Sequence, residues 1–221
     1  ALKENALNSE LLEIVQSLQS LLSEWGIRST KASEHGINKL NSLPFERQNK
    51  VLENTICYTK LMTEAAESGV DLKSNVAMLK HVSKKLEVTI PDGFIKKVKD
   101  SDLVEIYDLD QVQIYRNLRF FEVTSYSLYD LVVHEWPELY YRPNQVTLSL
   151  LKNIEKAFGA NGVLRIEADP HFMKEILGEH DQLNYVEFKY VAPIFCKNSG
   201  EVKGFVDSCH AEIVSDKKAY S

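Results

Sequence analysis

The cysteine and histidine side chains are the groups of this sequence best suited to nucleophilic or metal chemistry, and their spacing argues against both. The three cysteines, Cys57, Cys196 and Cys209, form no CxxC pair and are odd in number. This usage is typical of reduced, mostly buried thiols in a cytoplasmic protein. Dispersed histidines are more often surface or core groups than ligands, so we predict no metal site, with one assembled by folding as the alternative. The six histidines are His35, His81, His134, His171, His180 and His210.

Two short clusters hold reactive groups close in sequence. Cys209 and His210 are adjacent, and neighbours on a strand point to opposite faces, so they cannot form a hydrogen-bonded nucleophile and base. Glu167, Asp169 and His171 lie near a predicted strand end, where loop capping is the main interpretation and a functional site the alternative. The sequence contains no glycine-rich phosphate loop or nucleophile elbow. We therefore predict no catalytic residues.

Charge and hydropathy exclude two classes of partner. The net charge of −6 is spread over 26 basic and 32 acidic residues without a long run of one sign, so we expect no direct binding of nucleic acid. The basic cluster of Lys96, Lys97 and Lys99 is interrupted by Asp100 and is typical of a solvated face. No stretch approaches the roughly 20 apolar residues of a membrane span, so we predict a cytoplasmic protein.

The first part of the chain, residues 1–90, has helical periodicity. It predicts helices at about residues 8–25, 33–43, 44–68 and 72–86, which together form a bundle. The stripe on the first helix either packs against its own domain or forms a homodimer, and both interpretations stay open. That stripe consists of Leu11, Ile14, Leu18, Leu21 and Trp25. The apolar face predicted for the third helix consists of Phe45, Leu52, Ile56, Met62 and Ala65.

After Gly93 the period of the apolar residues changes from helical to two. We predict strands at 103–107, 111–115, 163–168, 185–196 and 202–214, with helices at 119–123, 127–133 and 144–158 between them. On strand 185–196 the even positions, Val186 to Cys196, form one buried face, opposite Glu187 and Lys189. The fold class is α+β: an N-terminal helical bundle followed by a five-stranded antiparallel sheet with flanking helices.

Two segments resemble the PAS family of sensory domains. In IYRNLRFFEVTSYS, residues 114–127, a strand ends in Asn117 and leads through an aromatic helix to the turn where the family has T-G-Y-S. Ser125 stands here in place of the glycine. The segments YVAPIF at 190–195 and SGEVKGFV at 199–206 resemble the family's closing hairpin. The resemblance implies a PAS-like domain at 93–214, followed by a tail at 215–221.

The resemblance also allows two family cofactors to be tested. Flavin-binding members carry a reactive Cys in N-C-R-F, and Leu118 occupies that position in the similar stretch 117–120, so thiol-adduct photochemistry is not supported. Haem-binding members often use a His on the long helix, and residues 144–158 contain none; His134 or His171 would have to serve instead. The cofactor is therefore left unknown.

The periodicity predicts a cavity between the sheet and the helix at 144–158, with a fully packed interior as the alternative. The leading hypothesis is a sensory module that binds a small ligand or partner and signals to an output domain beyond this sequence, in transcription regulation. The alternatives are a small enzyme using Tyr107, Tyr115, Glu167 and His171, or a structural dimerisation adaptor. The residues predicted to line the cavity are Phe120, Phe121, Tyr126, Leu150, Ile154, Phe188, Tyr190 and Ile194.

Overall fold

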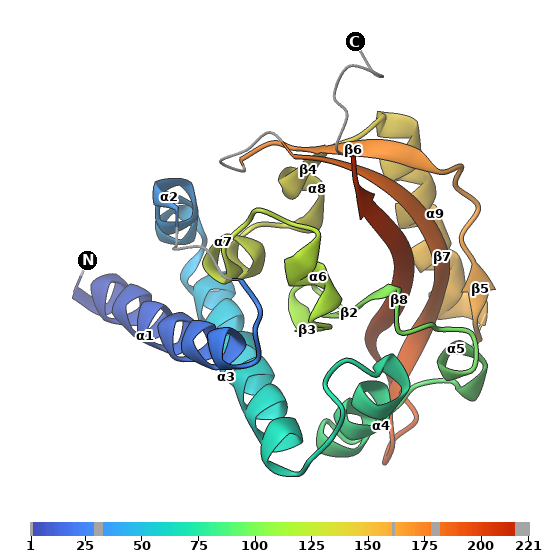
Figure 1. The fold of residues 1–221 in the computed structure, drawn as a ribbon, viewed down its shortest axis with the longest axis horizontal. Helices are drawn as coiled ribbons and strands as arrows, with labels where there is room; N and C mark the ends of the chain where they lie inside the picture. The colour runs from blue at the N-terminus through green and yellow to red at the C-terminus, as the bar shows by residue number, and fades with distance from the viewer. Residues whose placement is uncertain (1, 29–32, 161, 178–181, 215–221) are drawn as a thin grey trace.

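Four helices begin the chain, as the sequence predicted. The computed structural model describes residues 2–28, 33–160, 162–177 and 182–214; His180 and the tail at 215–221 lie outside them. The helices are α1 (Leu2–Glu24), α2 (Glu34–Ser42), α3 (Phe45–Glu67) and α4 (Asn75–Lys85). Figure 1 shows them at one side of a curved sheet. The side chains of Ser33 and Ser74 cap α2 and α4 by accepting a backbone N–H, which satisfies groups that a helix start leaves free.

The sheet is antiparallel and contains eight strands in the described part of the chain, so the prediction of five is corrected. Its order is β3-β2-β8-β7-β6-β4, and β1 and β5 each pair with β7. The three strands that the sequence did not predict are β1, β4 and β6. β1 and β4 have only two residues, too few to show an alternation, and the predicted strand 163–168 is reduced to the two residues of β5. The strands are β1 (Val88–Thr89), β2 (Leu103–Asp108), β3 (Gln113–Arg116), β4 (Tyr140–Tyr141), β5 (Leu164–Arg165), β6 (His171–Glu175), β7 (Leu183–Cys196) and β8 (Val202–Ile213).

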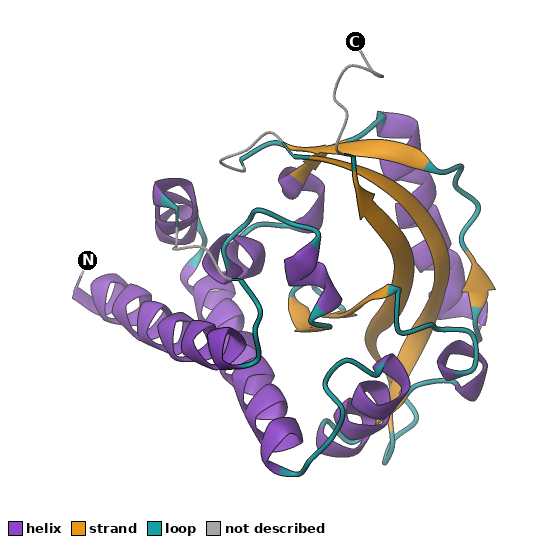
Figure 2. Cartoon of the chain, viewed as in Figure 1, coloured by secondary structure: helices purple, strands orange, loops and turns teal. Residues whose placement is uncertain are grey.

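Short helices and one long helix complete the second half of the chain, and Figure 2 shows them around the curled sheet. The long helix α9 contacts β7, β8 and β5. A capping box between Ser127 and Asp130 starts α7, which explains why the sequence places that helix correctly. The helices are α5 (Asp92–Ile95), α6 (Arg119–Glu122), α7 (Leu128–Val133), α8 (Trp136–Leu139) and α9 (Asn144–Ala160).

The two faces of the central strands differ. On what we call the packed face, Val104, Ile106 and Val206 are fully buried in the same core cluster as Leu79 of α4 and Phe94 of α5. The opposite, or pocket, face presents the intervening residues of β2 and β8, which line a cavity. These residues are Leu103, Glu105, Tyr107, Phe205, Asp207, Cys209 and Ala211.

A β-bulge in β7 overturns the predicted face of that strand. Phe188 pairs with Cys209, but Tyr190 pairs with Ser208, so Lys189 is an extra residue. One inserted residue reverses the alternation. Val186, Phe188 and Val191 therefore lie on the pocket face. Tyr190, Ala192 and Ile194 lie on the packed face instead, and the bulge Lys189 forms an ion pair of 2.6 Å with the fully buried Asp102.

A second correction concerns α3, where Phe45 and Ile56 are 50% and 41% exposed rather than buried. The buried stripe of this helix includes Gln48 and Thr55. Their side chains donate to the carbonyls of Leu43 and Val51, so both residues pack inward with their polar groups satisfied. Hydrophobicity alone misplaces a stripe that contains such residues.

The helical region packs against the sheet in one continuous core. Leu11 and Leu18 of α1 are fully buried within the chain, as expected if the stripe packs against its own domain. β1 adds a strand from the helical region to the sheet by pairing with β7. The division of the chain near residue 90 stays a prediction. Among the described helices, none has the length and apolar content needed to cross a membrane.

Candidate ligand pocket

A cavity of about 70 Å³ lies between the pocket face and the segments from α6 to α9. This volume is enough for several water molecules. The wall is mainly apolar, as in most small-molecule sites. Its charged and amide members come from β2, β7, β8 and the segment after β4. The helices and the segments beside them contribute Phe120, Val123, Trp136, Leu139, Leu150 and Ile154.

Four of the eight predicted lining residues are at this cavity. Phe120 of α6, Leu150 and Ile154 of α9, and Phe188 of β7 all line it. The helical period of α9 was therefore interpreted correctly. The bulge moves Tyr190 and Ile194 to the packed face. Whether a ligand binds there stays a prediction.

Phe121 and Tyr126 do not line the cavity, and both have other surroundings. Phe121 belongs to the same one-turn helix, α6, as Phe120 and is in the main core cluster, but only Phe120 lines the cavity. The Tyr126 hydroxyl donates to the carbonyl of Leu139 and accepts the amides of Ile176 and Leu177, each at 3.0 Å. Burial raises the pKa of Tyr126 to about 12. This side chain therefore holds two segments together.

The turn before Tyr126, which resembles the family's T-G-Y-S segment, is held by a buried carboxylate. Glu175 accepts the Thr124 hydroxyl at 2.8 Å, the Ser125 amide at 2.9 Å and the Ser125 hydroxyl. Several donors satisfy this buried acid, as a buried charge requires. The turn is a structural joint to β6.

Two carboxyl groups that the sequence analysis did not single out lie opposite each other on the pocket face. Glu105 of β2 is the cross-strand partner of Asp207 of β8. Glu105 accepts the Tyr107 hydroxyl and the Gln113 amide, each at 2.9 Å, and lies 3.4 Å from the guanidinium of Arg116. Oε1 of Glu105 thus has three donors within reach.

Asp207 has no such supply. Its Oδ1 is buried without a hydrogen-bond partner. Burial raises the pKa of Asp207 well above its usual value, and the negative charge of Glu105 raises it further. A carboxyl with one buried, unpartnered oxygen beside a second negative charge favours its neutral form. The floor of the cavity therefore holds an unsatisfied acid.

Arg142, just after β4, is the cation of the pocket. The residue is only 6% exposed, and its guanidinium lies 5.0 Å from the ring of Trp136. Its Nη2 donates to the Trp136 carbonyl at 3.4 Å, and its Nε has no partner. Burial lowers the pKa of Arg142, but a guanidinium stays protonated at neutral pH. Its type and position give no periodic signal, so sequence reasoning missed it.

The groups proposed for an enzyme do not gather at the cavity. Of the four, only Tyr107 lines it. Tyr115 packs edge-on against Tyr58 with ring centroids 6.1 Å apart, and Glu167 is exposed. His171 stacks on Phe188, and burial lowers the pKa of His171. The described side chains include no group of three metal-ligand type residues placed to hold an ion.

The adjacent Cys209 and His210 separate as expected for neighbours on a strand. Cys209 lines the cavity, and burial raises the pKa of its thiol well above the usual value. His210 lies on the opposite face of β8, where its Nε2 is 2.9 Å from a carboxylate oxygen of Glu212. The pair therefore offers no thiolate and base in contact.

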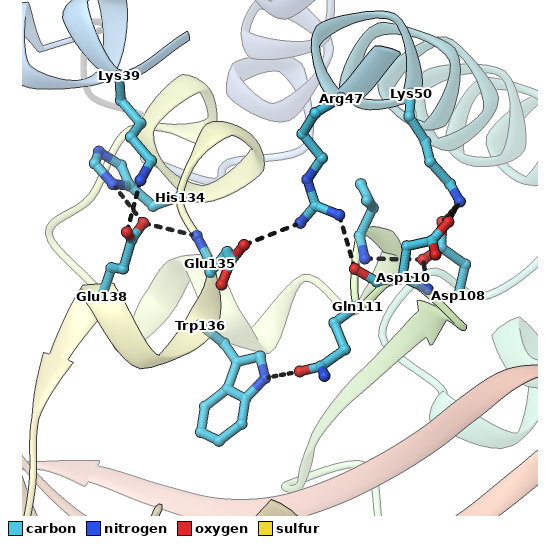
Figure 3. A network of polar contacts seen from close by, with 11 residues as sticks. Lys39, Arg47, Lys50, Asp108, Asp110, Gln111, His134, Glu135, Trp136 and Glu138 are labelled. Carbon is cyan, nitrogen blue, oxygen red and sulfur yellow. Dashed lines mark hydrogen bonds and ion pairs between the residues drawn. The ribbon is translucent and has the colours of Figure 1, made fainter. Parts of the chain in front are cut away.

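The helix α8 connects the cavity with the N-terminal helices through polar contacts (Figure 3). Trp136 lines the cavity and donates its indole N–H to Gln111 at 3.1 Å. The preceding residue, Glu135, lies 3.8 Å from the guanidinium of Arg47 on α3. Arg47 also donates to the carbonyl of Asp110 at 2.7 Å. The cavity wall is thus connected to α3 through the neighbouring residues Glu135 and Trp136 and their contacts with Arg47 and Gln111.

A second set of contacts joins α8 to α2. Glu138 accepts from Lys39 of α2 at 2.6 Å and lies 3.4 Å from Nδ1 of His134. Burial lowers the pKa of His134, so its neutral form is favoured. His134 does not line the cavity, and its Nδ1 is beside the carboxylate of Glu138. Glu135, the N-cap of α8, thus contacts α3, and Glu138 within α8 contacts α2.

Comparisons with known proteins give matches among solved structures only. No protein-family model and no curated protein sequence matches the chain. The structure is similar to the PAS domain of a protein from Colwellia psychrerythraea, with 15% identity, 52% of this chain and 86% of that chain covered, and a TM-score of 0.37. It is also similar to a sensory box sensor histidine kinase from Vibrio cholerae, with 13% identity, 56% and 90% coverage, and a TM-score of 0.34. One of these two solved structures is thus a PAS domain and the other a sensory box sensor histidine kinase.

Proposed function

We propose that this chain is a sensory signalling module that takes a small molecule into the cavity between the pocket face and α9. The observation that carries the proposal is the combination of an enclosed apolar wall with polar groups that the chain leaves unpartnered. Asp207 and Arg142 both face this cavity with buried atoms that lack hydrogen bonds. Such groups cost stability in a merely structural core. They are useful where a ligand supplies the missing partners.

The signal would leave the cavity through α8. A ligand that contacts Trp136 would displace a helix whose acids hold Arg47 of α3 and Lys39 of α2. Partly exposed ion pairs contribute only about 0–1 kcal/mol each, so they can be exchanged at low cost. Ligand occupancy would thus change how α8 is held by α2 and α3.

The output would act through another module, in the cytoplasm, and control of transcription is the output we propose. This part rests on the family resemblance in residues 114–127 and 190–206. A binding role, without catalysis, is proposed because Tyr115 and Glu167 lie away from the cavity and no reactive thiolate faces it.

The test begins with what the purified protein retains and what it binds. Denaturation followed by mass spectrometry would identify a co-purifying small molecule. In a Trp25→Phe variant, Trp136 is the remaining tryptophan, and its fluorescence can be titrated with benzoate, benzyl alcohol and benzylamine. We expect a retained molecule or saturable binding of at least one probe. Absence of both would refute the proposal.

A matched pair of variants locates the binding. Leu150→Phe places extra atoms in the cavity wall, whereas Leu79→Phe adds the same atoms to α4 in the main core. Binding should weaken at least about tenfold, or about 1.4 kcal/mol, in the first variant alone. Hydrogen exchange in α2 and α3 should also change on binding, because their contacts to α8 are altered. Equal effects of the two variants would place the binding elsewhere.

A further inference from the structure

We propose that the ligand of this cavity is a small carboxylate with an apolar body, whose anionic group binds Arg142; this inference rests on the proposed function. It names the chemistry of the ligand, which neither the cavity's position nor the fold does. Three features carry it: the missing counter-ion of Arg142, the state of Asp207, and the apolar wall.

The missing counter-ion is clearest when two buried arginines are compared. Arg116 is 2% exposed and has Glu105 at 3.4 Å, with Gln113 accepting from its Nε. Arg142 is 6% exposed, yet within the described residues no carboxylate lies within ion-pair distance of it. An unpaired buried charge is costly. The chain thus supplies a partner for one guanidinium and leaves the other to be paired from outside.

Geometry makes a carboxylate suitable for this position. A guanidinium presents a planar set of N–H donors that matches two carboxylate oxygens. Arg142 keeps Nε free, and its one bond, from Nη2, is long at 3.4 Å. The guanidinium carbon lies 5.0 Å from the centre of the Trp136 ring and 5.9 Å from that of the Tyr140 ring. Two aromatic rings thus neighbour the guanidinium at the cavity.

The second polar group of the cavity, Asp207, does not replace the ligand. It forms no ion pair with Arg142 within the described residues, and its Oδ1 stays without a partner. A carboxyl in its neutral form does not repel an incoming anion. It offers a hydrogen-bond position to a hydroxyl group of the ligand.

The apolar part of the cavity wall limits the body of the ligand. Leu150, Ile154, Val191 and Phe205 are apolar and line a space of about 70 Å³. Such a wall suits a ring or a short hydrocarbon chain. A phosphate would need several more donors than one arginine supplies, because it carries more charge and more oxygens. A monocarboxylate fits the single cation better.

The experiment measures affinity of the full chain for three probes of nearly equal shape: benzoate, 4-hydroxybenzoate and benzyl alcohol. Calorimetry and Trp136 fluorescence in the Trp25→Phe background both report binding. We expect benzoate to bind at least about tenfold more tightly than benzyl alcohol, as a charge-assisted hydrogen bond allows. Arg142→Met should abolish this preference, and Arg142→Lys should retain part of it. Arg165→Met, at an exposed arginine of β5, is the matched control and should change nothing.

The hydroxyl of 4-hydroxybenzoate tests the second contact. It should improve affinity about threefold to tenfold over benzoate, and Asp207→Leu should remove that gain. Circular dichroism checks that each variant is folded, and Arg142→Lys keeps the test valid if Arg142→Met does not fold.

The outcomes separate this inference from the proposed function. If benzoate and benzyl alcohol bind equally and Leu150→Phe weakens both, the cavity binds ligands but the carboxylate inference is overturned. A neutral co-purifying molecule would have the same consequence. A co-purifying carboxylic acid that is lost in Arg142→Met would support the inference even if the probes are too weak to measure. If no probe binds and nothing co-purifies, both proposals fail.

Discussion

The two faces of the central sheet are made by the same strands and yet have opposite chemistry. On the packed face, Val104, Ile106 and Val206 are fully buried among apolar side chains. On the pocket face, the intervening Glu105 and Asp207 lie opposite each other beside a cavity. Because side chains alternate along a strand, one residue separates a tightly packed core from a pair of half-buried acids.

The difference indicates that the packed face contributes most to stability, whereas the cavity side carries the groups suited to binding. The packed face contributes burial of apolar surface, worth roughly 25 cal/mol per Å². The pocket face includes Asp207 and Arg142, whose unpartnered atoms oppose folding. Natural proteins accept such costs mainly at functional sites. The packed face thus stabilises a framework in which the pocket face need not be optimal.

The bulge in β7 is what keeps the two faces aligned. Lys189 is the inserted residue, and its ammonium lies 2.6 Å from Asp102. Asp102 also accepts the amide of Lys99 at 2.9 Å. Without the inserted residue, Val191 would leave the cavity wall and Tyr190 would enter it.

The largest effect is expected from Asp102→Ala, which breaks this anchor. The carboxylate is fully buried, and its loss leaves the Lys189 ammonium, 19% exposed, without its counter-ion. Removing one member of a buried pair costs about 4 kcal/mol. Urea denaturation followed by circular dichroism would measure the change in unfolding free energy.

A surface ion pair supplies the control for this prediction. Glu201 and Lys203 are 72% and 51% exposed and lie 3.9 Å apart. Glu201→Ala should change the unfolding free energy by less than about 0.5 kcal/mol. An equally small effect of Asp102→Ala would mean that the bulge does not depend on the buried pair.

The second prediction compares the same truncation on the two faces. Ile106→Ala removes atoms from the packed face, where the side chain is fully buried, and should cost about 3 kcal/mol. Ile154→Ala lies at the cavity wall and is only partly buried, so less contact is lost. We expect its cost to be roughly half as large. Equal costs in thermal or urea unfolding would contradict a looser packing of the pocket face.

Much of the fold follows from the sequence because its signals are local. The four N-terminal helices have clear periods, and so do the strands β2, β3, β7 and β8 and the long helix α9 after Gly93. Ser127 and Asp130 mark the start of α7. The two-residue strands β1 and β4 have no period to recognise, whereas β5 lies within the predicted strand 163–168. They form because the curled sheet offers unpaired backbone edges, which is a property of the folded chain.

The candidate site was half predictable for a related reason. Leu150 and Ile154 follow from helical spacing, whereas the face of Tyr190 depends on a bulge that no local pattern marks. Glu105 and Asp207 alternate with apolar residues just as solvent-facing groups do. Only the helices packed over that face show that these acids are enclosed.

The smallest effect is expected at Asp207, whose burial on the pocket face lowers the unfolding free energy. Burial raises the folded-state pKa of this carboxyl above its unfolded value of about 4. The folded state then binds the proton more strongly, so stability falls as pH rises from about 4 through the folded pKa. Asp207→Asn removes that loss and should raise the unfolding free energy at pH 8 by about 1 kcal/mol, or about 2–4 °C in Tm.

The gain should shrink as the pH falls toward 4.5, because the cost of keeping wild-type Asp207 neutral in the folded state diminishes as the pH approaches the unfolded-state pKa of about 4. Thermal unfolding between pH 4.5 and 8.5 measures this difference, and Asp207→Leu, which also cannot titrate, should show the same pH dependence. A gain that is independent of pH would mean that Asp207 is not held in its neutral form. In that case the cavity floor would already bear a charge, and the contrast between the two faces would be larger than the contacts of Asp207 indicate.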